Sequence, residues 1–352
     1  MITVNTKEFK RALTNCKTCW NGKSSLPVLQ NVLIASVEHG NLRLCTTNLE
    51  RGIVQHLPGY TEGDGINTTV PLKELYDYVS KVKGSSITLE LDDKYLVLDG
   101  VIKLRVTKAE EFPPIPGIAD AVPNGTLIPD DLNAVIHAAS TDDMRPVLQG
   151  VYVTTACMTC TDGFRMAVRS GITDTAKDII IPVDTIKAAL KIDKKCTGIP
   201  MRLNAERGQV ILTVSNGYIV SPLIKGNFPD VSAIVPRETS ILAMFDRKEL
   251  IEAATMVGSF YGSKDSQLLL MDVRSGSCTL RNRSDGERPE AERTIECDCN
   301  SGIDTALNWK YLVDVLKVLK EDAVLMQFNA DNTPIMITEG SHVEVIMPMH
   351  KG

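Results

Sequence analysis

The sequence predicts an α+β protein made of three tandem copies of one repeat, each with antiparallel strands and two amphipathic helices. A P-V-L-Q segment occurs twice, at Pro27 and at Pro146, which lie 119 positions apart. After each one come two alternating strands, a Thr-rich turn and an arginine that we expect to point outward. Positions in the second helices, Leu75, Ile186 and Leu312, are 111 and 126 residues apart. A period of this size indicates duplicated domains and not a solenoid.

The first repeat begins with a helix whose apolar positions recur at helical spacing behind Asn5 or Thr6 as the N-cap. The other elements follow in order: a hairpin (26–54), a second amphipathic helix (68–82), a β-meander through an Asp-Asp turn (86–106) and a proline-rich linker (110–118).

The second and third repeats have the same order. The second comprises a helix (127–140), the P-V-L-Q hairpin (145–168), a helix (179–192), a hairpin around an Asn-Gly turn (209–224) and a closing N-F-P-D-V run (227–236). The third comprises a helix (245–257), strands around a Ser-Gly turn (268–282), a helix (307–319) and final strands (324–349). The predicted domains are therefore residues 1–118, 125–235 and 240–352.

Composition places the chain among ordinary globular proteins, because 43% of its residues are hydrophobic and 23% are charged. At 352 residues it is too long for one core and fits two or three domains. The start has no apolar signal region, and no run reaches the roughly 18 apolar residues of a membrane span. We therefore expect a cytoplasmic protein without membrane contact.

The nine cysteines are expected to be reduced thiols. Two C-x-x-C pairs, Cys16 with Cys19 and Cys157 with Cys160, offer a zinc site as an alternative. The two pairs occupy different positions of the repeat, one at a helix end and one in a hairpin. This disfavours a zinc site in which all four thiolates form a tetrahedron around the metal. The five histidines form no metal-spaced pair, and phosphate-binding and nucleophile motifs are missing from the sequence. No metal, cofactor or catalytic residue is predicted.

A net charge of −6 argues against nucleic-acid binding by the whole surface, although a local basic face remains possible. The helices carry most of the clustered lysines: Lys7 and Lys10; Lys73, Lys81 and Lys83; Lys187, Lys191, Lys194 and Lys195; Lys310, Lys317 and Lys320. This bias is a hint of polyanion contact, but a solvated helix face is the more common explanation. Asp77, Asp184 and Asp314 on the same helices weaken the hint.

Five segments in one order give the chain a family resemblance along its full length: L-P-V-L-Q-N-V, E-E-F-P-P-I-P, R-P-V-L-Q-G-V with T-D-G-F-R-M-A, N-F-P-D-V and V-I-M-P-M. The chain resembles the sliding clamps, the β subunits of bacterial DNA polymerase III. The resemblance implies a head-to-tail homodimeric ring of DNA-clamp domains, with antiparallel sheets outside and helices inside. Duplex DNA would thread the ring without sequence readout, and the clamp would tether the replicative DNA polymerase without an active site.

The resemblance also implies an apolar cleft for short peptide motifs of the polymerase, the clamp loader and repair factors. Carried over by position, its residues are Leu148, Thr161, Gly163, Phe164, Arg165, Met166, Pro229, Ile234, Asn308, Tyr311, Pro334, Ile346, Met347, Pro348 and Met349. Methionine side chains can repack around different ligands, which suits several partners. The alternative to a peptide-binding cleft is that these residues only pack in the hydrophobic core of a domain.

DNA contacts are expected at Lys10, Lys23, Lys73, Lys191 and Lys317, and a dimer seam is expected between the strand of Ile102 and Leu104 and the other protomer's region around Phe260. Phe260 has an equally good explanation as a local core residue.

The chain departs from the family pattern in several places. Phe164 stands where histidine is common, and His350 where arginine is common. Pro146 and Val147 replace aromatic residues of some relatives, whereas Lys23 keeps a basic residue. Two other functions stay open: a repeat-built enzyme with an inter-domain pocket, and a ring-shaped protein scaffold that does not thread DNA.

Overall fold

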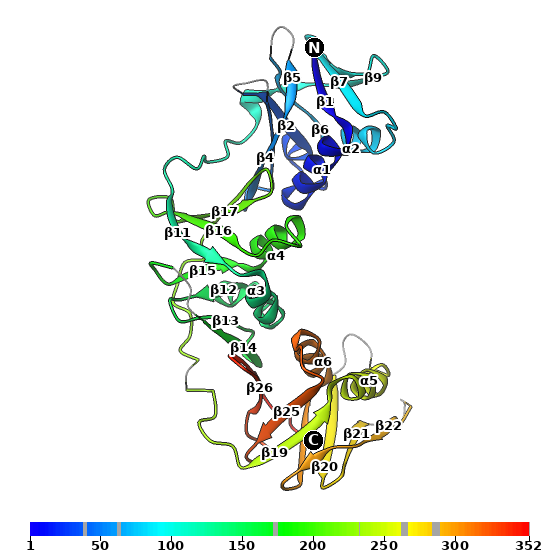
Figure 1. Cartoon of the computed structure of the whole chain (residues 1–352), viewed down its shortest axis with the longest axis vertical. Coiled ribbons are helices and arrows are strands. Elements are labelled where there is room, and N and C mark those ends of the chain that lie inside the picture. The colour runs from blue at the N-terminus through cyan, green and yellow to red at the C-terminus, as the bar shows by residue number, and fades with distance from the viewer. Residues whose placement is uncertain are drawn as a thin grey trace. The chain divides into compact units, whose positions relative to one another are not determined.

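The computed structural model describes residues 1–37, 41–61, 65–171, 175–231, 233–261, 267–283 and 289–351. The chain forms two compact units: unit 1 is Met1–Pro129 with Asp184–Leu223, and unit 2 is Asp130–Val183 with Ile224–Gly352. Figure 1 labels the elements. Each unit is described by itself.

Unit 1 contains two antiparallel sheets. The five-stranded sheet has the order β5 (Gly59–Thr61), β1 (Ile2–Asn5), β7 (Ser86–Leu91), β8 (Tyr95–Leu98) and β9 (Ile102–Arg105). The nine-stranded sheet has the order β10 (Thr107–Lys108), β6 (Asn67–Pro71), β2 (Asn31–Ser36), β3 (Leu42–Thr47), β4 (Gly52–Leu57), β18 (Gly217–Pro222), β17 (Gln209–Val214), β16 (Ile199–Asn204) and β11 (Val122–Leu127). Its helices are α1 (Thr6–Cys16), α2 (Leu72–Val79) and α4 (Val183–Ile192).

The helices of unit 1 form where the apolar spacing predicts them. Asn5 is the N-cap of α1, and its side-chain oxygen accepts hydrogen bonds from the backbone N–H groups of Lys7 and Glu8. Phe9 and Leu13 are fully buried on the inner face of α1. α2 is shorter than expected because the Thr-rich residues before it belong to β6. In Figure 1 α1 lies against β4, and it also contacts β3.

The sheets of two repeats join directly in unit 1. β4 pairs antiparallel with β18, so that Val54 lies opposite Tyr218. A Cβ atom at Gly217 would lie 1.9 Å from the carbonyl oxygen of Val54, so only glycine permits this approach. Asn216 supplies the left-handed residue of the hairpin turn, with φ of 58°. The first and second repeats are therefore joined edge to edge at this strand pair.

Unit 2 also contains two antiparallel sheets. Its nine-stranded sheet has the order β15 (Ile179–Pro182), β12 (Gly150–Val153), β13 (Cys157–Thr161), β14 (Arg165–Ser170), β27 (His342–Ile346), β26 (Ile335–Glu339), β25 (Ala323–Phe328), β19 (Ile241–Asp246) and β23 (Asp298–Cys299). The four-stranded sheet is β22 (Glu292–Ile295), β21 (Ser277–Asn282), β20 (Leu268–Arg274) and β24 (Ile303–Asn308). Its helices are α3 (Pro129–Val135), α5 (Arg247–Gly258) and α6 (Trp309–Val318).

The two P-V-L-Q segments adopt the same structure, which supports the repeat. Both are single 3₁₀ turns, Pro27–Gln30 and Pro146–Gln149, and each leads into a strand. The helix expected over residues 127–140 is shorter: α3 begins at Pro129 and gives way to a 3₁₀ turn at Ile136. Proline favours the first turn of a helix, and Leu127 is instead the last residue of β11.

A polar cluster lies beneath the joint between β14 and β27 in unit 2. Glu344 is fully buried, and its Oε1 lies 2.8 Å from Nε2 of His342 and 3.3 Å from Nε2 of His137. Nearby, Nε of Arg169 donates to Oδ1 of Asp131 at 2.8 Å. The contact between Glu344 and His137 links β27 to the 3₁₀ turn after α3.

Candidate functional site

The turn between β13 and β14 is held by its own side chains. Oδ1 of Asp162 accepts hydrogen bonds from the N–H groups of Phe164 at 2.8 Å and Arg165 at 3.0 Å. Oγ1 of Thr161 accepts the N–H of Gly163 at 3.1 Å and donates to the carbonyl of Arg165 at 2.7 Å. Gly163 has φ of 91°, which suits glycine. This fixed turn projects Phe164 with 57% of its surface exposed.

Arg165 does not point outward as expected, because only 11% of its side chain is exposed. Its Nε lies 3.1 Å from Oδ2 of Asp162, and its Nη1 lies 2.7 Å from Oδ2 of Asp314. The guanidinium also lies over the ring of Tyr311, 4.3 Å from the centroid. Burial, and next the Asp162 carboxylate, raise the pKa of the Tyr311 phenol. The two carboxylates explain why the arginine is buried.

A pocket of about 270 Å³ opens beside this turn. Its lining residues are Ala139, Ser140, Thr141, Asp142, Arg145, Asp162, Phe164, Arg165 and Tyr311. Arg145 is 52% exposed, and its Nε lies 3.7 Å from Oδ2 of Asp142. A Cβ at Gly163 would lie 3.0 Å from Nη1 of Arg145, so the glycine lets this guanidinium cross the turn. The pocket therefore combines an exposed aromatic wall with one exposed cation.

The last residues of the chain run beside Phe164. Ile346 lies opposite Arg165 in the β14–β27 pairing, and the N–H of Met347 donates to the carbonyl of Phe164 at 2.8 Å. Met347 is 36% exposed. Met349 instead packs on the buried cluster of Tyr261, Leu268 and Ala306. Of the two methionines, Met347 is the more exposed.

The other residues expected at the cleft divide into three groups. Leu148, Met166 and Ile346 are buried and support the surface from below. Pro229 and Ile234 are exposed on the segment before β19, and Pro334 before β26 and Pro348 after β27 are half-buried. Asn308 is the N-cap of α6, since its side chain accepts the N–H of Lys310 at 2.9 Å. The pocket brings together three of the expected residues: Phe164, Arg165 and Tyr311.

Sequence reasoning missed the loop that forms the other wall, Ala139–Arg145, and the carboxylates of Asp162 and Asp314. Asp162 also stabilises the turn, through its two hydrogen bonds to backbone N–H groups. The repeat contains a pattern from which this turn could have been predicted. Asn48 and Arg51 stand at the same turn positions in unit 1, and Oδ1 of Asn48 accepts the N–H of Arg51 at 2.8 Å.

The lysines expected to contact DNA are all exposed, on α1, α2, α4 and α6 and in the loop before η2 (Pro27–Gln30). Among the described residues no carboxylate lies within 4.0 Å of their ammonium groups. They are Lys10, Lys73, Lys191, Lys317 and Lys23. Such unpaired ammonium groups can contact phosphates but carry no base-reading geometry.

At the expected seam, Leu104 is 6% exposed and Ile102 is half-buried on β9, while Phe260 is 42% exposed just after α5.

In the described ranges, no group of three or more His, Cys, Asp or Glu side chains could hold a metal ion. The nine cysteines are free thiols. Within the same part of the chain, no helix is long and apolar enough to cross a membrane.

Comparison with known proteins covers the whole chain. Family models of the DNA polymerase III beta subunit match residues 1–116 (N-terminal domain), 126–230 (central domain) and 232–350 (C-terminal domain). The beta sliding clamp of Synechocystis is 28% identical over 89% of this chain and 88% of its own. That of Rickettsia felis is 26% identical over 99% of both chains. Among solved structures, the DNA polymerase sliding clamp of Bacillus subtilis has a TM-score of 0.89 at 19% identity, covering 100% of this chain and 99% of its own. The beta subunit of Thermotoga maritima has a TM-score of 0.88 at 21% identity, covering 100% of both chains.

Proposed function

The chain belongs to the DNA polymerase III beta subunit family, and on that premise we propose that it is a sliding clamp for DNA replication. The family is one of non-catalytic processivity factors. The observation that carries the proposal is the match of three consecutive clamp-domain models along the chain, at the period that the repeats predict. Duplex DNA passes through the ring, and the clamp holds the replicative DNA polymerase to it.

Sliding requires contacts that are attractive and independent of sequence. The exposed, unpaired lysines of α1, α2, α4 and α6 fit this need, because an ammonium on a flexible stem can follow phosphates without reading bases. A net charge of −6 for the whole chain disfavours nonspecific binding elsewhere. We also propose a cytoplasmic location, where bacterial replication takes place.

Partner proteins bind through short peptide motifs at the surface around Phe164, Met347 and the adjoining pocket. Phe164 is 57% exposed although two hydrogen bonds hold its backbone: its N–H donates to Oδ1 of Asp162, and its carbonyl accepts the N–H of Met347. Burying each apolar anchor of a peptide there gains about 1.5–3 kcal/mol. After ordering costs, two or three anchors give affinities on the order of micromolar, which suits exchange among polymerase, clamp loader and repair factors.

The clamp is a homodimer in which the β9 edge, with Ile102 and Leu104, meets the part of the other protomer that includes Phe260. An exposed phenylalanine supports an interface at that position. Edge strands with unpaired backbone groups favour association with another strand.

The peptide surface is tested with the double variant Phe164→Ala/Met347→Ala. Fluorescence polarisation with a labelled peptide that carries the polymerase's clamp-binding motif should show affinity lowered roughly 10- to 100-fold, since two apolar contacts are lost. Leu49→Ala is the matched control, because Leu49 is 60% exposed at the equivalent turn of unit 1. Equal affinities of the double variant and the control would disprove the assignment of this surface.

Clamp function is tested separately by primer extension on a primed circular template. The wild-type protein, loaded by its clamp loader, should lengthen the products made in one polymerase binding event. Lys23→Glu should shorten residence on that template, because it replaces an exposed cation with an anion. A wild-type protein without effect on product length would refute the proposed function itself.

A further inference from the structure

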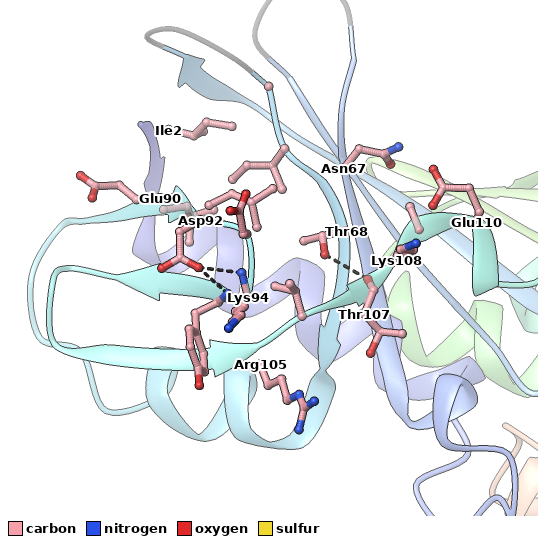
Figure 2. Close-up of a pocket in the computed structure, with 18 of the residues that line it drawn as sticks. Ile2, Asn67, Thr68, Glu90, Asp92, Lys94, Arg105, Thr107, Lys108 and Glu110 are labelled. Carbon is pink, nitrogen blue, oxygen red and sulfur yellow. Dashed lines mark hydrogen bonds between the residues drawn. The ribbon is translucent and has the colours of Figure 1, made fainter.

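Unit 1 contains a pocket of about 300 Å³ between its nine-stranded sheet and the linker that follows the first repeat. The apolar part of its wall includes Leu33 of β2, Val54 of β4 and Phe112 of the linker. Three exposed polar side chains also line it: Arg43 of β3, Asn67 at the start of β6 and Glu110 at the start of the linker. Asn67 and Glu110 line the neighbouring groove as well, which Figure 2 shows. A volume of this size is at the small end for ligand pockets, so the pocket fits a single ring.

The strand registers show which residues of the second repeat correspond to the pocket. In both repeats the first strand begins opposite the proline that precedes the second helix: Asn31 opposite Pro71, and Gly150 opposite Pro182. Two residues along that strand, Leu33 therefore corresponds to Tyr152. Four residues before the proline, Asn67 corresponds to Asp178. Each linker also carries one Phe-Pro pair, so that Phe112 corresponds to Phe228.

In unit 2 a tyrosine ring lies among the corresponding residues. The ring of Tyr152 stacks on that of Phe228, with the centroids 4.8 Å apart and the planes 10° apart. Its hydroxyl donates to Oδ2 of Asp178 at 3.0 Å. Unit 1 has Leu33 where this tyrosine stands, and leucine has neither the ring nor the hydroxyl. The pocket therefore lies where unit 2 places the phenol of its own chain.

A cation at the rim distinguishes the pocket from its counterpart. Arg43 is exposed, and no carboxylate of the described residues lies within 4.0 Å of its guanidinium. Burial raises the pKa of the Cys45 thiol in the pocket wall to about 11, and the Arg43 charge acts in the opposite direction, so its field reaches the pocket. By the same register the corresponding residue of unit 2 is Cys157. An unpaired guanidinium beside an apolar wall favours a ligand that carries a carboxylate.

We propose that this pocket binds a tyrosine side chain of a partner protein that has a carboxylate next to it. The ring packs on Leu33 and Phe112, its hydroxyl bonds to the amide of Asn67, and the carboxylate pairs with Arg43. A tyrosine is specified because a tyrosine occupies the corresponding space in unit 2. The proposal goes beyond the proposed function, since the pocket lies in unit 1 and the peptide surface around Phe164 lies in unit 2.

The test uses N-acetyltyrosine as the probe, and saturation-transfer difference NMR follows its binding to the full-length protein. One ring, one hydrogen bond and one exposed ion pair should give a dissociation constant in the millimolar range. Leu33→Tyr should weaken binding roughly 10-fold or more, because the chain's own ring then fills the pocket as in unit 2. Leu33→Met is the matched control and should bind like wild type, since it nearly conserves the side-chain volume. Circular dichroism melting checks that both variants are folded.

The carboxylate contact is tested with a second probe that does not alter the apolar wall. N-acetyltyrosinamide lacks the carboxylate and should bind wild type roughly 2- to 5-fold more weakly than N-acetyltyrosine. Arg43→Gln should abolish this difference, and because Arg43 is exposed the substitution leaves the core unchanged. Equal binding of the two probes by wild type would overturn the assignment of Arg43.

The double variant Phe164→Ala/Met347→Ala separates this pocket from the peptide surface, and it should bind N-acetyltyrosine as wild type does. Three results would overturn the proposal: wild type without saturable binding of N-acetyltyrosine at tens of millimolar, equal binding by wild type and Leu33→Tyr, or loss of binding in the double variant. None of them would alter the primer-extension assay, so a failure of this proposal is distinguishable from a failure of the clamp function.

Discussion

Replacing Arg165 by methionine tests whether the buried arginine fixes the site. The side chains of Arg165 and Asp162 are only 11% and 13% exposed, and their nearest N and O atoms are 3.1 Å apart. Removing one partner of such a buried pair costs about 3–5 kcal/mol, because the remaining charge is left desolvated. Asp314 is 42% exposed and so keeps part of its hydration. We therefore expect Arg165→Met to destabilise unit 2 by about 3 kcal/mol, at the lower end of that range.

The equivalent arginine of unit 1 provides a matched control. Arg51 is 18% exposed, but its partner Asp184 is 64% exposed and lies 3.6 Å away. An exposed partner makes an ion pair worth less than about 1 kcal/mol. Arg51→Met should therefore cost about 1 kcal/mol in unit 1. The turns have the same hydrogen bonds, so the contrast between the two variants measures what surrounds Arg165 and not Arg51: a second carboxylate, the Tyr311 ring and deeper burial.

The two tryptophans allow each unit to be followed by itself. Trp20 belongs to unit 1 and Trp309 to unit 2, where its Nε1 donates to Oε1 of Gln267 at 2.9 Å. Urea unfolding is monitored by fluorescence in a Trp20→Phe background for unit 2 and a Trp309→Phe background for unit 1. Equal losses for the two arginine variants would refute the reasoning.

A second substitution makes the test stricter. Asp162→Asn in the Arg165→Met background should recover part of the loss, because asparagine keeps the turn acceptor and needs no counter-charge. Asn48 plays this part in unit 1, where its Oδ1 accepts the N–H of Glu50 at 3.2 Å. If the free energy of unfolding is not recovered, the destabilisation comes from the lost packing of Arg165 and not from its lost charge.

Three further predictions follow from the backbone and the thiols. Gly163→Ala should destabilise unit 2 by about 1–2 kcal/mol in the same urea assay, because φ is 91° and the new Cβ meets Arg145; an unchanged midpoint would contradict this. Leu49→Gly should stabilise unit 1 by about 1 kcal/mol, since Leu49 has φ of 74° and little burial to lose; a lower midpoint would count against a strained turn. Burial raises the pKa of the Cys45 thiol from 9.0 to about 11, so its contribution to stability is full below 9.0 and is lost as the pH rises toward 11. In native protein at pH 8, mass spectrometry should find iodoacetamide on the half-buried Cys157 and Cys196 before Cys45, and early labelling of Cys45 would refute its burial.

Much of the fold could be predicted because its signals are local. The apolar spacing of Phe9 and Leu13, the Asn-Gly turn at Asn216 and the duplicated P-V-L-Q segments each act over fewer than about 20 residues, and each is confirmed. Helix ends were less predictable. Leu127 and the Thr-rich run before Leu72 belong to strands because the neighbouring strands pair with them.

The candidate site was only partly predictable because its key contacts join distant positions. Arg165 and Asp314 are 149 residues apart, and nothing in the local pattern of either residue indicates the other. Without that partner, an arginine after a turn is expected to point to solvent, which is wrong here. The loop with Asp142 and Arg145 was missed for the same reason, since loops carry no periodicity.

The amino-acid sequence by itself determined the repeat, the type and order of most elements and the polar turns, because these depend on propensity, periodicity and hydrogen bonds between near neighbours. Only the tertiary structure decided which strand edges join, that Arg165 is buried between two carboxylates, and that Met347 faces solvent while Met349 packs inward. Those outcomes depend on desolvation and on charges brought together from distant segments, and such energies exist only once the chain has folded.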